Sequence, residues 1–107
     1  MICHLFSGVM FPPIDQVTKQ GHDLQFGVSV LGHFYLTKLL LPVMLDTAKD
    51  TPNGKVRVVS TSSSAMLLAP PSGIDYATLK DGPVRRRSDP VKLYQQAKAV
   101  GSSRLYY

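Results

Sequence analysis

A long apolar helix followed closely by a strand constrains the fold of this chain more than any other feature. One side of the helical pattern is apolar at spacings of four, three, four and four, at Leu24, Val28, Leu31, Tyr35 and Leu39. The opposite side is apolar as well, at Phe26, Val30, Phe34, Leu36 and Leu40. A helix that is apolar on all sides is usually buried, so this pattern predicts that other parts of the protein cover most of its surface.

The helix leads into a strand through a short turn. Pro42 is expected to kink or end the regular helix near Leu41, because proline removes a helical hydrogen bond. Asn53 and Gly54 then supply a turn, and residues 55–60, KVRVVS, have the β-branched content of a strand. Residues 1–8 contain a first short strand, ICHLF. A strand soon after a long helix indicates an α/β unit with parallel pairing.

Size and composition allow a single domain with a core. The chain has 107 residues, of which 44% are hydrophobic and 18% charged. The one cysteine, Cys3, excludes an internal disulfide and is typical of a reducing compartment, so a cytoplasmic location is expected. The first residues lack the basic start and long apolar run of a secretory signal.

Two further features could point to membranes or nucleic acids, and neither is favoured. Residues 28–45 are strongly apolar, but polar residues and a proline disfavour a membrane span there: His33, Thr37, Lys38 and Pro42. The net charge of +5 comes partly from the run of residues 85–87, RRR, which could contact phosphates. A solvated loop is the favoured interpretation. Residues 66–89, rich in Pro, Gly, Asp and Arg, are predicted to be a surface insertion.

The last predicted helix places a phenol and an ammonium on one face. Asp89 and Pro90 suit its N-cap and first position, and Gly101 suits the position after its end. Tyr94 and Lys98 are four residues apart, so their side chains can share one pocket. A nearby positive charge favours the phenolate form of a tyrosine, which makes the pair a plausible acid–base unit. Taken alone, a solvated pair remains the more common explanation.

Hydroxyl groups cluster where the predicted strand 55–60 ends. The residues that follow it are TSSSA, from Thr61 to Ala65. In open α/β sheets ligands bind at the carboxyl ends of the strands, so these hydroxyls are well placed for chemistry. Serines in a loop are nevertheless commonplace.

Several strings in one order resemble the short-chain dehydrogenase/reductase family, most closely its retinol-dehydrogenase-like branch. They are GVM from Gly8, GHDLQFGVSVLGHFYLT over residues 21–37, KVRVVSTSSSA over residues 55–65, and LYQQAK ending at Lys98. The resemblance covers roughly residues 7–98. It implies an α/β fold: the C-terminal, catalytic half of a Rossmann-like doubly wound parallel sheet, with the chain truncated at both ends and residues 101–107 as a divergent tail.

The resemblance also implies roles for individual residues. Tyr94 would exchange a proton with the oxygen of an alcohol or carbonyl, and Lys98 would favour its phenolate and hold the ribose of NADP or NAD. The substrate-orienting serine falls best on Ser63, with Ser62 and Ser64 as close alternatives. Gly8 is the retained glycine of the family's Asn-Asn-Ala-Gly motif, and the resemblance implies that Gly8, Tyr94 and Lys98 contact the cofactor. The implied substrate is an apolar alcohol, aldehyde or ketone.

The sequence also departs from the family pattern. The asparagine expected in the long helix, which helps a water to relay protons to the lysine, falls on Ser29, and the asparagine before the serine run is Ser60. No glycine-rich phosphate loop follows a first strand. The competing prediction is therefore a non-catalytic remnant that acts at most as a dimerisation or interaction module, since the missing half of the sheet would leave apolar surface uncovered. A homodimer is the expected assembly, and a basic interaction module built on residues 85–87 is a weaker third alternative.

Overall fold

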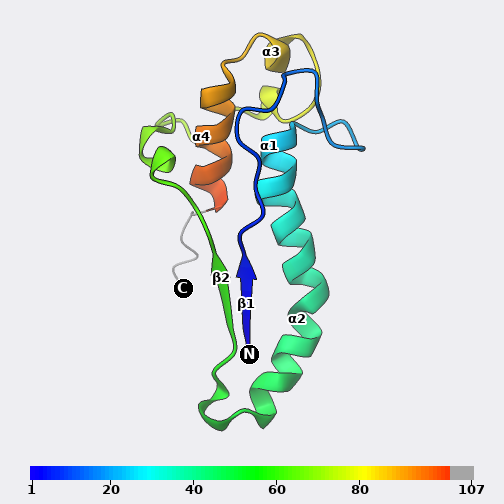
Figure 1. Cartoon of the computed structure of the whole chain (residues 1–107), viewed down its shortest axis with the longest axis vertical. Helices are drawn as coiled ribbons and strands as arrows, with labels where there is room; N and C mark the ends of the chain where they lie inside the picture. The colour runs from blue at the N-terminus through cyan, green and yellow to red at the C-terminus, as the bar shows by residue number, and fades with distance from the viewer. Residues whose placement is uncertain (102–107) are drawn as a thin grey trace.

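The computed structural model describes residues 1–101 and has an elongated α/β arrangement, 51 × 29 × 19 Å along its principal axes. Figure 1 shows two strands running beside one long helix, with a second helix lying against their upper end. The strands are β1 (Ile2–Leu5) and β2 (Arg57–Ser60). The α-helical segments are α1 (Leu24–Phe26), α2 (His33–Asp50), α3 (Pro83–Arg86) and α4 (Pro90–Gly101). A π-helical turn, η1 (Gly27–Gly32), and three 3-10 turns, η2 (Pro52–Gly54), η3 (Ser64–Leu68) and η4 (Tyr76–Thr78), complete the order.

The two strands pair in parallel, as the helix-then-strand pattern predicts. Ile2 lies opposite Arg57 and Leu5 opposite Ser60, so the register is unshifted along both strands. The hydrogen bond from Thr61 N to Leu5 O, at 2.8 Å, extends the pairing by one step beyond β2. Parallel strands need a crossover between them, and here the long helix supplies it. The predicted α/β unit is confirmed.

The crossover is one continuous helical run from α1 through η1 to α2. Asp23 caps its start, because Asp23 Oδ2 accepts a hydrogen bond from Phe26 N at 3.0 Å. Pro42 lies inside α2, and the helix continues past it to Asp50. Of the two outcomes expected at Pro42, a kink or an end, the end of the helix is therefore excluded.

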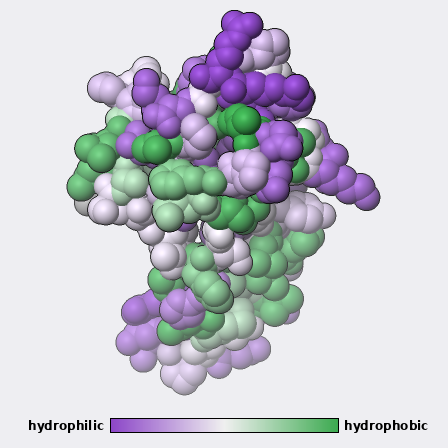
Figure 2. Space-filling view, turned by 45° about the horizontal axis from the view of Figure 1, so that its top comes forward, coloured by the Kyte–Doolittle hydropathy of each residue, from purple (hydrophilic) through white to green (hydrophobic). Residues whose placement is uncertain are grey.

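Most of the apolar surface of α2 is exposed, so the prediction of a helix covered on most sides is wrong for this chain. Within α2 only Met44 is buried, whereas Phe34 is 68% exposed. The physical reason is that a sheet of two strands is too narrow to cover more than one side of a helix. Figure 2 shows hydrophobic surface, in green, extending into the lower half of the molecule where α2 runs in Figure 1.

The run from Leu24 to Asp50 is also the only helix within residues 1–101 that is long and apolar enough to cross a membrane by length and composition. The core helix of a soluble α/β protein can have the same length and composition, so these two properties are shared by core helices and membrane-crossing helices.

The compact part of the molecule is its upper end, where α4 packs against α1, η1 and η3. Leu93 and Ala97 on α4 are fully buried there, together with Phe26 of α1. Lower down, Leu5 at the end of β1 and Met44 on α2 are the buried apolar side chains. The core is therefore concentrated around the helix that carries the predicted tyrosine and lysine.

Candidate active site

The helix that carries the candidate site begins where the sequence predicts. Asp89 Oδ1 accepts a hydrogen bond from Val91 N at 2.9 Å, which is an N-cap interaction with Pro90 as the first helical residue. Gly101 is the last helical residue that the structure describes, not a residue beyond the helix. The predicted divergent tail after Gly101 lies outside the described residues.

Tyr94 and Lys98 lie together on one face of α4. Lys98 Nζ is 5.6 Å from the centroid of the Tyr94 ring, within the range of a cation–π contact. Lys98 is only 8% exposed and Tyr94 is half-buried. An ammonium held this far from water exerts a stronger field on its neighbours than a solvated one. The predicted neighbourhood of phenol and ammonium is present.

Gly8 and Ser29 also lie near the Lys98 ammonium. A Cβ atom placed on Gly8 would lie 3.3 Å from Lys98 Nζ and 3.7 Å from Ser29 Oγ. Ser29 is 4% exposed, and its hydroxyl has no hydrogen-bond partner among the described residues. These three residues come from the loop after β1, the π-helical turn and α4, so the fold gathers residues that the sequence keeps far apart.

The serine segment also lies against α4. Ser62 Oγ donates to the backbone oxygen of Lys98 at 3.0 Å, which ties the end of β2 to the helix. Ser63 Oγ instead accepts a hydrogen bond from Ala65 N at 3.2 Å and caps η3, which begins at Ser64. An accepting hydroxyl keeps its own proton for donation, whereas Ser62 uses its proton on Lys98. Between these two serines, the hydrogen bonding therefore favours Ser63 as a donor to a ligand.

Two buried glutamines position α4, and no pattern in the sequence predicts this role for them. Gln25 Nε2 donates to Pro90 O at 2.9 Å, and Gln25 Oε1 accepts from Phe11 N at 3.2 Å. Gln96 Nε2 donates to Thr78 Oγ1 at 2.8 Å, and Gln96 Oε1 accepts from Asp75 N at 3.1 Å. The one sequence signal for them is a polar residue on an apolar helix face, and that signal does not show which distant group the amide will bind.

The arginine run 85–87 is not the solvated loop that the composition favours. Arg85 is 1% exposed and forms an ion pair with Asp23, with 2.9 Å between Arg85 Nε and Asp23 Oδ1. Arg86 pairs with Asp81 at the surface. The expectation is wrong for Arg85 because the guanidinium satisfies several acceptors from distant segments at once. Part of the predicted surface insertion 66–89 is therefore packed into the molecule.

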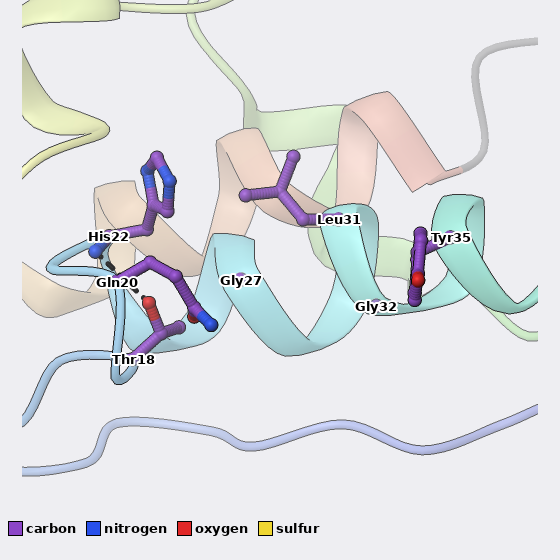
Figure 3. Close-up of a pocket in the computed structure, with 7 residues that line it drawn as sticks. All are labelled: Thr18, Gln20, His22, Gly27, Leu31, Gly32 and Tyr35. Carbon is purple, nitrogen blue, oxygen red and sulfur yellow. Dashed lines mark hydrogen bonds between the residues drawn. The ribbon is translucent and has the colours of Figure 1, made fainter.

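A separate pocket of about 490 Å³ lies beside the π-helical turn. Figure 3 shows Gly27, Leu31 and Gly32 along the helix, with His22 and Gln20 above its start; Thr18 and Tyr35 complete the lining. Thr18 Oγ1 accepts a hydrogen bond from His22 N at 3.1 Å. None of the predicted site residues lines this pocket, so it is distinct from the candidate active site.

Comparisons with known proteins agree with the resemblance in the sequence. The chain is 48% identical over 92 residues to a short-chain dehydrogenase/reductase of Armillaria gallica, covering 86% of this chain and 28% of the relative. It is 42% identical over 93 residues to a short-chain dehydrogenase/reductase of Emericella nidulans, covering 87% and 29%. An uncharacterized oxidoreductase of Schizosaccharomyces pombe is 42% identical over 73 residues, covering 68% and 21%. No family model matches, and no solved structure matches.

The chain has an α/β fold, and these matches relate it to oxidoreductases. The chain belongs to the short-chain dehydrogenase/reductase family, and it spans less than a third of the length of the curated relatives it matches.

Proposed function

We propose that this chain provides the acid–base part of an NAD(P)-dependent oxidoreductase site that interconverts an alcohol and a carbonyl. The observation that carries the proposal is the placement of Lys98 Nζ 5.6 Å from the Tyr94 ring, next to the segment that contains Ser63. In this role Tyr94 gives a proton to a carbonyl oxygen or takes one from an alcohol. The low exposure of Lys98 keeps its charge effective on the phenol.

Ser63 would orient the reacting oxygen. Its hydroxyl accepts from Ala65 N and is thereby held in one direction, while its proton remains for the substrate. The hydroxyl of Ser62 is committed to Lys98 O, which holds the serine segment and α4 together. Ser64, the first residue of η3, stays an alternative.

The local geometry fits a nicotinamide cofactor at Gly8 and Lys98. A side chain on Gly8 would fill the space next to Lys98 Nζ, so glycine leaves that space open for a ligand. Lys98 would donate hydrogen bonds to ribose hydroxyls there. The cofactor, when bound, supplies or accepts the hydride. NADP and NAD are both compatible with these residues.

Ser29 would bind an ordered water molecule beside Lys98. Its hydroxyl is buried and unpartnered among the described residues, and it faces the space near Gly8 that Lys98 Nζ also approaches. A buried polar site with two or more polar groups is where an ordered water binds. Such a water would pass protons between Lys98 and solvent. We expect Ser29→Ala to lower turnover and Ser29→Asn, which keeps a polar side chain, to retain more of it.

The test is turnover by the purified chain with NADPH or NADH and a series of apolar aldehydes and ketones. Tyr94→Phe removes only the phenol oxygen and should abolish the reaction. Tyr76→Phe is the matched control, because Tyr76 is 76% exposed on η4 and should leave turnover unchanged. Activity that survives Tyr94→Phe, or a wild-type chain with no activity, would overturn the proposal for this chain.

A non-catalytic role as a dimerisation module is the second candidate, and the exposed face of α2 favours it. Phe34, Leu39 and Val43 are each more than half exposed, and apolar patches of this kind favour association. We expect a homodimer in the cytoplasm in this case. Light scattering that gives the mass of a monomer at high concentration would reject it.

The basic-module alternative is weaker than the other two. Arg85 is buried in an ion pair and Arg86 binds Asp81, so Arg87 is the member of the run that no described ion pair engages. Binding to nucleic acid that does not weaken as salt increases would argue against this alternative.

A further inference from the structure

Phe11 has a backbone conformation that its side chain does not favour. Its φ is +54°, in the left-handed region, and Asn53 is the only other non-glycine residue within residues 1–101 with a positive φ. Asparagine adopts this region comparatively easily, whereas a bulky aromatic residue there is an outlier. Such strain persists only where surrounding interactions hold the residue in place, and it concentrates at functional sites.

The interaction that holds Phe11 in place comes from a buried amide. Phe11 N donates to Gln25 Oε1 at 3.2 Å, and Gln25 Nε2 donates to Pro90 O at 2.9 Å. Gln25 is 2% exposed, and both of its hydrogen bonds are part-buried, so competition from water is reduced. Pro90 is the first residue of α4, one helical turn before Tyr94. The amide therefore fixes the loop of Phe11 relative to the start of the helix that carries the candidate acid–base residue.

The result of this conformation is a contact between two rings. The Phe11 and Tyr94 ring centroids are 5.5 Å apart, with an angle of 67° between the ring planes, which is an edge-to-face arrangement. Phe11 is 46% exposed, so burial of its own side chain does not explain why the strained backbone is kept.

We propose that Phe11 is a positioning residue for Tyr94, and that Gln25 acts on Tyr94 through Phe11. The inference rests on the proposed function, because the orientation of the phenol matters for catalysis only if Tyr94 transfers a proton. Lys98 Nζ approaches the same ring, with 5.6 Å to its centroid. Contacts from Phe11 and Lys98 together restrict the rotation of the Tyr94 ring about its side-chain bonds. An acid–base group with fewer accessible orientations reaches its reacting geometry more often.

The test is the nuclear magnetic resonance spectrum of the chain labelled with ¹³C in its tyrosine rings. Loss of one set of signals in Tyr94→Phe assigns the Tyr94 ring. Phe11→Leu, which keeps an apolar side chain but removes the ring, should shift these signals. Phe11→Tyr should restore the wild-type position. Gln25→Ala should shift them in the same direction as Phe11→Leu, although no hydrogen bond joins Gln25 to Tyr94. Lys92→Ala, an exposed residue of the same helix, should leave them unchanged.

Tyr94 signals that stay at the wild-type position in Phe11→Leu would overturn the proposal. Signals that move in Phe11→Leu but not in Gln25→Ala would overturn the part assigned to Gln25. Phe11→Gly guards against a folding failure, because glycine adopts the positive φ without strain and should give the same shift as Phe11→Leu. If Gln25→Ala does not fold, Gln25→Glu keeps the acceptor for Phe11 N while losing the donor to Pro90.

Kinetics separate this inference from the proposed function. Where the chain turns over substrate, Phe11→Leu should lower kcat by up to about 100-fold and leave KM for the cofactor unchanged. Failure of Tyr94→Phe to affect turnover would reject the function while leaving the ring contact intact. Loss of turnover in Tyr94→Phe together with unshifted signals in Phe11→Leu would reject the positioning role and keep the function.

Discussion

Arg85 and Asp23 form a buried ion pair between segments that are 62 positions apart, with side chains 1% and 2% exposed. Arg85 also donates to Ile14 O at 2.6 Å and to Gln16 O at 2.9 Å. The second carboxylate oxygen of Asp23 caps the long helix. One guanidinium therefore joins α3, the loop before the long helix and the start of that helix, all of which lie on the path between β1 and α4.

Arg85→Met should destabilise the chain by about 3–5 kcal/mol, because it leaves Asp23 as an uncompensated buried charge. Asp23→Asn should cost a similar amount for the converse reason, and it weakens the helix cap as well. Urea unfolding followed by circular dichroism gives the free energies of unfolding. Arg87→Met is the matched control at an exposed arginine and should change stability by less than about 0.5 kcal/mol. Equal unfolding midpoints for the two arginine variants would contradict the prediction.

The ion pair also shows which parts of the fold could be predicted from sequence. The strands, their parallel pairing, the long helix and the start of α4 follow from local patterns, such as Asp89 and Pro90 at a helix entry. The burial of Arg85 depends on four acceptors distributed along the chain, and a local run of arginines gives no sign of them. The exposure of α2 could not be predicted from its apolar pattern either. Periodicity shows which side chains are apolar, but it does not show whether other elements of the chain pack against them.

The candidate site also contains residues that local sequence patterns predict and residues that they do not. Tyr94 and Lys98 are brought together by the period of one helix, which is a local property. Gly8, Ser29 and the serine segment join them through tertiary packing, and family resemblance was the only guide to those residues. Gln25 and Phe11 were missed because an amide that bridges two backbone groups has no sequence pattern, and a positive φ is not visible at a phenylalanine.

Gly27→Ala should be destabilising because of one methyl group on a neighbouring loop. A Cβ on Gly27 would clash with Thr18 Cγ2, so the Thr18 side chain, whose hydroxyl accepts from His22 N, or its loop must shift, at a cost of about 1–3 kcal/mol. Thr18→Ser removes that methyl and keeps the hydroxyl that accepts from His22 N. In the Thr18→Ser background, Gly27→Ala should be neutral or stabilising by up to about 1 kcal/mol, since alanine favours helices over glycine.

The four free energies of unfolding of this cycle give the coupling between positions 18 and 27. Gly32→Ala is the control within the same helical run, because the atom nearest to its Cβ would be the oxygen of Gly27, at 3.4 Å. A Gly27→Ala variant that is as stable as Gly32→Ala, with no coupling to Thr18→Ser, would show that the loop does not press on the helix as described.

The surface pair of Asp81 and Arg86 should make stability depend on pH in the acid range. Arg86 donates two hydrogen bonds to Asp81, at 3.0 and 2.6 Å, and these lower the pKa of the Asp81 carboxyl below its ordinary value of 3.8. A carboxyl whose pKa is lower in the folded state stabilises the fold above its unfolded pKa. That contribution is lost as the pH falls through the folded-state pKa.

Asp81→Asn keeps an acceptor for Arg86 but removes the charge. The difference in melting temperature between the wild type and Asp81→Asn should be constant at neutral pH and should shrink as the pH falls below 3.8. In an Arg86→Gln background the Asp81→Asn substitution should have a much weaker pH dependence. The effect is small because Arg86 is 61% exposed and water screens the pair. A difference that grows toward acid pH would have the wrong sign.

The strained backbone at Phe11 predicts an unusual order of stabilities. At a position with φ of +54°, Phe11→Gly should be more stable than Phe11→Ala by about 1 kcal/mol, because alanine pays for its Cβ in the left-handed region and glycine does not. Both variants lose the same contact with the Tyr94 ring, so their comparison isolates the backbone. At the neighbouring Met10, which is exposed and has no positive φ, the order should be reversed, since glycine there only adds freedom to the unfolded chain. Urea unfolding of the four variants measures both differences, and the same order at positions 10 and 11 would show that Phe11 is not held in the left-handed region.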